Sequence, residues 1–172
     1  MKMIKLEESL MEEAMVEIFE WFRDFLSGEW AVFLTAWLPF AELRLSIPLG
    51  IARGIDPERV YLLAVIGNMV PVIPLLLLLK PVKRLLKSHF SLMKKFFDYL
   101  DKRTIKKSDK VDKYGAFGLI LFTAVPFPTT GAWTASLAAV LFNIKFKYAF
   151  LAISFGVIIA GIVVMIMSLV IW

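Results

Sequence analysis

A carboxylate and a guanidinium lie two residues apart in an apolar stretch, at Glu42 and Arg44. Residues two apart do not face each other on a regular helix, so either the backbone is unwound here or each group has a partner elsewhere. A guanidinium is a bidentate partner for phosphate or carboxylate, and a carboxylate removed from water can carry a proton. The pair therefore indicates a transport site. A structural ion pair, or two side chains that reach one membrane surface, is the simpler interpretation.

A second polar segment, Pro126–Trp133, interrupts apolar sequence with prolines, threonines and a glycine. If a short helix that spans only half of the membrane begins at this break, its N-terminus carries about half a positive charge and free N–H groups, which attract anions. Trp133 is either a substrate platform or a packing residue, and the prolines alone would serve as backbone breaks. The predicted substrate and proton pathway comprises Glu42, Arg44, Pro48, Gly50, Asn68, Pro126, Pro128, Thr129, Thr130, Gly131 and Trp133.

The composition is that of an integral membrane protein. Of the 172 residues 59% are hydrophobic, and the mean hydropathy is +0.75. The chain has no cysteine and one histidine, His89, which excludes disulfides, thiol nucleophiles and a zinc site built from this chain alone. We expect no cofactor, no metal and no enzymatic activity, because Glu42 is the only acid within an apolar segment and no Gly-x-Ser-x-Gly or His-Glu-x-x-His pattern occurs.

Short apolar pieces flank the first polar segment. Trp30–Pro39 would form about 15 Å of helix, roughly half of a 30 Å hydrocarbon core, and Leu45–Ile51 is shorter still. The nineteen residues Tyr61–Leu79 are long enough to span, with kinks expected at the two prolines. Asn68 in this run belongs either to the pathway or to an interhelical hydrogen bond.

The same order of pieces repeats in the second half. Gly115–Val125 and Trp133–Phe142 are short apolar pieces around the second break, and Tyr148–Trp172 is a second spanning run; at an offset of 87 residues, Pro39 falls on Pro126. Internal symmetry of this kind is typical of transporters built from inverted repeats. We predict an all-α membrane protein with two inverted repeats, each a re-entrant helical hairpin plus a transmembrane helix. A plain four-span arrangement is the alternative, which the positive-inside rule does not separate from the hairpins.

The charge is unevenly distributed along the chain. Residues 1–29 carry three basic and eight acidic residues and are predicted to form an amphipathic helix, on the membrane or packed on the bundle. Residues 80–113 carry twelve lysines and arginines against four aspartates, which predicts a cytoplasmic, interfacial helix on anionic lipid and not a nucleic-acid site. The predicted organisation has a helix at 1–29, repeat 1 at 30–79, the basic linker at 80–113 and repeat 2 at 114–172. The predicted anionic-lipid contacts are Lys83, Arg84, Lys87, Lys94 and Lys95.

Both polar segments resemble signatures of one protein family. These are Glu42-x-Arg44-x-x-Ile47-Pro48-x-Gly50 and Pro126-x-Pro128-x-Thr130-Gly131-Ala132-Trp133-Thr134. In this order they are similar to motifs of the prokaryotic small multidrug export proteins, and the resemblance extends from about Trp30 to the C-terminus. It departs from the family pattern at Thr129 and Ala135, where glycine is expected. That family is distantly similar to the DedA and scramblase-like superfamily, whose members have paired re-entrant hairpins and are tied to translocation of lipid-carrier phosphate or phospholipid.

Two functions follow as expectations. The first is a multi-pass transporter in the cell membrane, with residues 80–113 in the cytoplasm. It would move an amphipathic or anionic small molecule or a lipid phosphate. We further expect proton coupling through Glu42. The second is a membrane scaffold that does not transport and that binds anionic lipid or a partner protein through the basic linker. Substrate, energy source, direction of transport and assembly into a homo-oligomer are left open.

Overall fold

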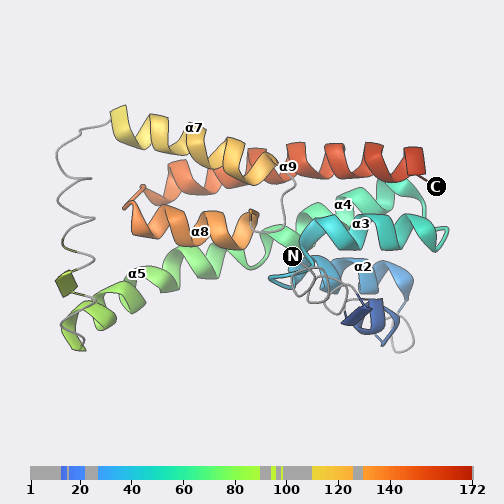
Figure 1. The fold of residues 1–172 in the computed structure, drawn as a ribbon, viewed down its shortest axis with the longest axis horizontal. Coiled ribbons are helices and arrows are strands. Elements are labelled where there is room, and N and C mark those ends of the chain that lie inside the picture. Colours follow the sequence, from blue (N-terminus) through green and yellow to red (C-terminus); the bar gives the residue numbers. More distant parts are fainter. Residues whose placement is uncertain are drawn as a thin grey trace, which may run out of the picture. The chain divides into compact units, whose positions relative to one another are not determined.

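The computed structural model describes residues 13–14, 16–21, 27–89, 94–95, 98, 110–125 and 130–171. Its elements are α2 (Gly28–Trp37), α3 (Glu42–Ala52), α4 (Pro57–Met69), α5 (Val72–His89), α7 (Lys110–Ala124), α8 (Ala132–Leu141) and α9 (Phe146–Ile171), as Figure 1 shows. Across these described ranges the chain is helical and has no strand, so the predicted all-α class is confirmed.

The chain divides into two compact units. The first unit comprises Met1–Asn68 and Gly161–Trp172, and the second unit comprises Met69–Ala160. The first therefore contains α2, α3 and nearly all of α4, whereas the second contains α5, α7, α8 and the first part of α9.

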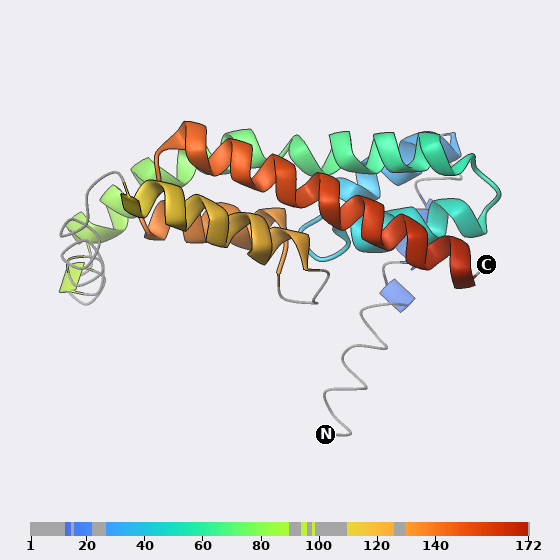
Figure 2. The same ribbon diagram turned by 90° about the horizontal axis from the view of Figure 1, so that it is seen from above.

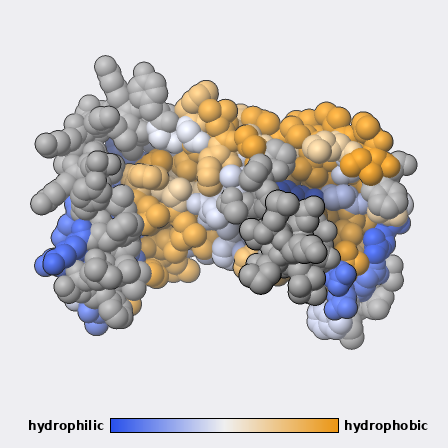
Figure 3. Space-filling model, viewed as in Figure 1, coloured by the Kyte–Doolittle hydropathy of each residue, from blue (hydrophilic) through white to orange (hydrophobic). Residues whose placement is uncertain are grey.

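Two stretches are long and apolar enough to cross a membrane. They are Pro57–His89, which comprises α4 and α5, and Phe146–Ile171, which is α9. The helix is interrupted at Val70 and Pro71, where the sequence predicts a kink, because proline cannot donate the backbone hydrogen bond of a continuing helix. Many large apolar side chains of these helices are exposed, and Figure 3 shows wide hydrophobic areas on the surface. Exposed apolar surface of this extent is what lipid tails cover, and it indicates a membrane protein.

In the first unit α2 and α3 form a helical hairpin closed by the turn at residues 38–41. A Cβ atom placed on Gly28 would lie 3.0 Å from Ile55 Cδ1, and one on Gly50 would lie 2.8 Å from Val32 Cγ2. The start of α2 thus lies beside the end of α3, and the two helices run back along each other (Figure 1). Their 10 and 11 residues correspond to about 15 Å of helix each, half the thickness of a hydrocarbon core.

In the second unit α7 and α8 form a corresponding hairpin. A Cβ atom on Gly115, near the start of α7, would lie 3.1 Å from the Cδ1 atom of Ile144, just after α8. The two helices pack against each other, and Figure 2 shows α7 running along α8. Residues 126–129 of the turn between them lie outside the described residues.

The joint that follows each hairpin has the same backbone hydrogen bonds. In both joints the second and third residues after the helix donate their N–H groups to carbonyls three and five residues earlier, which is a Schellman motif. The bonds are Gly54 to Ile51 (2.9 Å) and Ile55 to Gly50 (3.2 Å) after α3, and Asn143 to Val140 (3.2 Å) and Ile144 to Ala139 (2.9 Å) after α8. The left-handed residue of each motif is Gly54 (φ 76°) or Asn143 (φ 54°), 89 positions apart. A hairpin, the same joint and a long helix therefore occur twice in the chain.

A glycine brings each long helix close to the first arm of its hairpin. A Cβ atom on Gly67 of α4 would lie 2.4 Å from the carbonyl oxygen of Phe33 in α2. A Cβ atom on Gly156 of α9 would lie 2.5 Å from the Cβ of Thr123 in α7. Small residues at such contacts let membrane helices approach closely. These two glycines are also 89 positions apart, so the packing of the hairpins repeats along with their joints.

The described part of the N-terminal segment packs on the first unit. Phe19 is fully buried, and the guanidinium of Arg53 lies 5.4 Å from the centroid of its ring. Arg53 also forms an ion pair with Glu20. Packing on the bundle, one of the two positions expected for this segment, is therefore observed at Phe19 and Glu20. The other residues of the predicted helix at 1–29, apart from 13–14 and 27–29, lie outside the described residues.

Candidate functional site

Glu42 begins α3 directly after the turn of the first hairpin. Its φ is 48°, in the left-handed region that a residue other than glycine rarely adopts. Such a conformation costs about 1–3 kcal/mol and persists only where the surroundings impose it. The side chain is 6% exposed. Backbone strain and a buried carboxylate thus coincide at the helix break, which makes Glu42 a functional candidate.

Arg44 lies two positions after Glu42 and is half-buried. The carboxylate of Glu42 is close enough for its charge to act on the guanidinium of Arg44. The helix break explains how two residues that a regular helix would hold apart can interact. The pair is chemically suited to an exchange, because an anionic ligand could take the guanidinium from the carboxylate when the carboxylate is protonated.

The polar groups of the first unit extend beyond this pair. Glu42, Ser46 and Gly50 follow one another at a spacing of four and are buried, so they lie on one face of α3. Thr35 of α2 and Asn68 of α4 are buried as well. We call Thr35, Glu42, Ser46 and Asn68 the polar layer. Sequence analysis missed Thr35 and Ser46, because a hydroxyl in an apolar helix ordinarily bonds to its own backbone.

Three of the predicted pathway residues have local structural consequences. Pro48 lies inside α3 and has no N–H to donate to the carbonyl of Arg44. Gly50 is required by packing, since a Cβ atom there would lie within 2.9 Å of both Val32 and Val60. Among the described residues the Oδ1 atom of Asn68 accepts no hydrogen bond.

The second polar segment is described only from Thr130 onward, and Pro126, Pro128 and Thr129 lie outside the described residues. The hydroxyl of Thr130 donates to the carbonyl of Val125 at 2.7 Å and so ties the start of α8 to the end of α7. Gly131 is buried immediately before α8, and Trp133 is half-buried in its first turn. These three residues belong to the second unit, whereas Glu42, Arg44 and Asn68 belong to the first.

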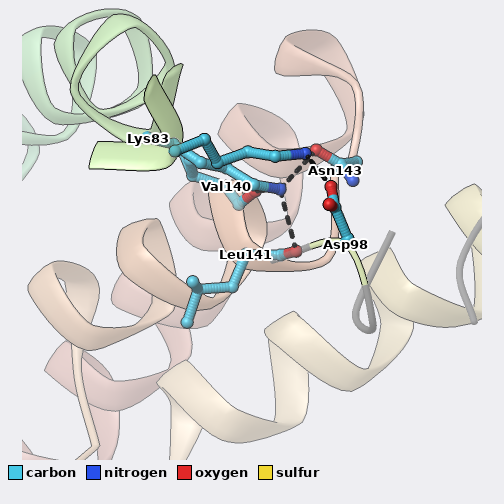
Figure 4. A network of polar contacts seen from close by, with 6 residues as sticks. Lys83, Asp98, Val140, Leu141 and Asn143 are labelled. Atoms are coloured by element: carbon cyan, nitrogen blue, oxygen red, sulfur yellow. Dashed lines mark hydrogen bonds and ion pairs between the residues drawn. The ribbon is translucent and has the colours of Figure 1, made fainter. Parts of the chain in front are cut away.

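Lys83, a predicted lipid contact, is turned into the protein. Its side chain is 9% exposed, and its Nζ donates to the Oδ1 of Asn143 at 2.9 Å and to the carbonyls of Val140 and Leu141 at 3.5 Å (Figure 4). The last carbonyls of a helix carry partial negative charge and attract cations. The ammonium group of α5 therefore caps the C-terminus of α8.

The other predicted lipid contacts differ in exposure. Lys87 is half-buried and pairs with Asp98 at 2.8 Å. Figure 4 shows Asp98 close to Lys83 and Asn143. Arg84, Lys94 and Lys95 are exposed. The α5 helix runs without interruption across the predicted start of the linker at residue 80 and ends at His89. Within the described ranges no group of acidic, histidine or cysteine side chains is arranged to hold a metal ion.

The comparison with protein families decides the identity of the chain. A family model described as "Putative small multi-drug export protein" matches residues 42–163. The chain belongs to this family. The resemblance found in the two polar segments is thereby confirmed, and the matched range of the small multi-drug export family begins at Glu42 and includes both polar segments. Comparison with curated proteins and with solved structures gives no match.

Proposed function

We propose that this small multi-drug export protein is a transporter that moves an amphipathic or anionic small molecule, or a lipid phosphate, across the membrane. Membership of the export family supports transport in general terms. One observation supports the position of the pathway: Glu42 is strained, 6% exposed and electrostatically coupled to Arg44 at a helix break. Lipid-phosphate translocation, as in DedA-like proteins, stays a prediction.

The proposal includes hairpins that enter and leave the membrane on one side. The contact of Lys83 Nζ with Asn143 Oδ1 at 2.9 Å supports this, because it joins the basic end of α5 to the joint after α8. If α7 and α8 together crossed the membrane, that joint would lie about 30 Å away on the opposite side. With one crossing after each hairpin, the second repeat is inverted relative to the first.

Mechanistically, the first hairpin supplies an anion-binding tip. The N-terminus of α3 carries positive partial charge, and Arg44 adds a bidentate donor. A proton on Glu42 removes the negative charge that competes for Arg44, so an anion can bind. Loss of that proton to the other side of the membrane returns the carboxylate to the guanidinium and releases the anion. This cycle would couple anion movement to a proton.

The test is reconstitution of the purified chain in liposomes, with a panel of lipid phosphates and cationic drugs, with and without a pH gradient. We expect Arg44→Ala to reduce transport at least tenfold. Glu42→Gln should abolish the response to the pH gradient. The matched control is the exposed ion pair of Arg59 and Glu29 in the same unit, whose Nη1–Oε1 distance is 3.2 Å. Arg59→Ala and Glu29→Gln should transport normally, and normal transport by Glu42→Gln and Arg44→Ala would refute the assignment.

The alternative of a scaffold that binds lipid through the basic linker is less well supported. Lys83 and Lys87, two of the five predicted lipid contacts, are engaged within the protein by Asn143 and Asp98. The exposed Arg84, Lys94 and Lys95 can still contact anionic headgroups. Such contacts suit an accessory role beside transport.

A further inference from the structure

Three oxygen atoms of the polar layer are buried without a hydrogen-bond partner in the part of the chain that the structure describes. Among the described residues, Thr35 Oγ1, Ser46 Oγ and Asn68 Oδ1 make no hydrogen bond, and the three residues are at most 1% exposed. A buried polar atom without a partner lowers stability, so its retention requires an explanation. Three such atoms on three helices of one unit indicate a shared purpose.

Other hydroxyls in the described helices are hydrogen-bonded and so avoid this loss of stability. Four of them donate to the carbonyl four residues earlier in their own helix. These are Thr123, Ser136, Ser154 and Ser168, with distances of 2.7 to 2.8 Å. Thr35 and Ser46 also have helical residues four positions earlier, yet neither hydroxyl makes this bond within the described structure.

The contacts of the two glycines place the polar layer at the meeting of α2, α3 and α4. A Cβ atom on Gly50 would touch both Val32 and Val60, so the three helices converge there. Thr35 and Ser46 lie about one helical turn from that contact, both toward the hairpin turn.

The second glycine contact fixes the position of Asn68. Its neighbour Gly67 packs on Phe33 and on the Cβ of Ala36, which is next to Thr35. Glu42 lies one further turn along α3 on the same face as Ser46. Glu42 therefore occupies one end of the polar layer.

The hairpin fold does not itself require these groups, because the second unit builds the same joint without them. The offset of 89 that relates the joints places Gly131, Ala135 and Val157 at the positions of Glu42, Ser46 and Asn68. The packing glycine is retained at Gly67 and Gly156. The polar side chains are thus specific to the first unit, and function is the simplest reason for them.

We propose that the polar layer binds a small monovalent cation, sodium. Lone pairs of hydroxyl, amide and carboxylate oxygens are the ligands that hard cations prefer. Glu42 contributes one negative charge, which the nearby Arg44 offsets, so a single positive charge suits the site better than two. The site shares Glu42 with the proposed pathway but does not depend on transport.

The test uses the full-length chain purified in detergent. Binding of radioactive sodium should be saturable and displaced by unlabelled sodium chloride but not by potassium chloride. Thermal unfolding should shift upward in sodium chloride relative to potassium or choline chloride at equal ionic strength. Thr35→Val, Ser46→Ala and Asn68→Val should each weaken sodium binding at least tenfold. Thr123→Val and Ser136→Ala remove hydroxyls that bond to their own helix, and they should bind sodium normally.

The unfolding temperature in choline chloride separates a sodium site from a structural role. Ser46→Ala and Asn68→Val should there be at least as stable as the unmodified protein, because each removes an unpaired polar atom. In saturating sodium chloride the same two variants should be less stable than the unmodified protein, because they no longer bind sodium. The proposal is overturned if the variants lose equal stability in all three salts, or if the unmodified protein responds equally to sodium, potassium and choline. Sodium binding without any transport would overturn the proposed function alone.

Discussion

At the residue scale, strain at Glu42 can be measured apart from its charge. Glu42→Gly and Glu42→Ala both remove the carboxylate, but only glycine adopts a φ of 48° without cost. We expect Glu42→Gly to be more stable than Glu42→Ala by about 1–2 kcal/mol, the cost of the left-handed conformation for a residue with a Cβ atom.

Thermal unfolding of the two variants in detergent checks this expectation. In both, transport should no longer respond to the pH gradient, because that response depends on the carboxylate and not on the backbone conformation. Equal stability of the two variants, or greater stability of Glu42→Ala, would show that the turn is not strained at this residue.

The sequence predicted some residues of the site and not others, for physical reasons. Glu42 and Arg44 were predictable because a charge in apolar sequence is costly and therefore conspicuous. Thr35 and Ser46 were not, since only coordinates show whether a helical hydroxyl bonds to its own backbone. Lys83 was expected at the lipid surface, but its chain length also allows it to reach the carbonyls at the end of a neighbouring helix. A pattern of charges does not distinguish these two uses of a lysine.

At the element scale, two glycines determine how closely the long helices approach the hairpins. Gly67→Ala would place a Cβ atom 2.4 Å from the carbonyl oxygen of Phe33, and Gly156→Ala would place one 2.5 Å from the Cβ of Thr123. Overpacking of this kind costs about 1–3 kcal/mol. We expect both variants to unfold at a lower temperature than the unmodified protein.

Gly118 of α7 is the matched control for these glycines. A Cβ atom there would have no neighbour within 4 Å among the described residues. Gly118→Ala should therefore be neutral or more stable by about 0.5–1 kcal/mol, because alanine favours a helix. Destabilisation of Gly118→Ala as large as that of Gly67→Ala would contradict the packing argument.

The elements themselves were largely predictable. Short apolar pieces around a break became the hairpin arms, and the apolar runs that begin near Tyr61 and Tyr148 became parts of the two long stretches. The exact relation of the halves was not predictable. Matching prolines gave an offset of 87, whereas the Schellman joints are 89 apart, because the turn at 125–131 is longer than the turn at 38–41. The residues of a turn have no regular hydrophobic periodicity, so the length of the turn cannot be inferred from the sequence.

At the scale of the whole molecule, the decisive question is which joints lie on which side of the membrane. Both topologies place residue 80 and the segment after it on one side and Asp56 on the other. They differ at Lys145, next to the joint that Lys83 contacts through Asn143. A re-entrant hairpin puts Lys145 on the side of the basic linker, whereas four spans put it on the side of Asp56. The contact within the second unit favours the hairpin.

Cysteine labelling tests this in a chain that has no cysteine of its own. Asp56→Cys, Arg84→Cys and Lys145→Cys replace exposed residues, so a membrane-impermeant maleimide can reach each of them from one side only. In oriented vesicles we expect Arg84→Cys and Lys145→Cys to react from the same side, and Asp56→Cys from the opposite side. Arg84 is preferable to Lys83, whose replacement would remove the cap of α8. Reaction of Lys145→Cys together with Asp56→Cys would establish four spans, and it would refute the proposal that each hairpin enters and leaves the membrane on one side.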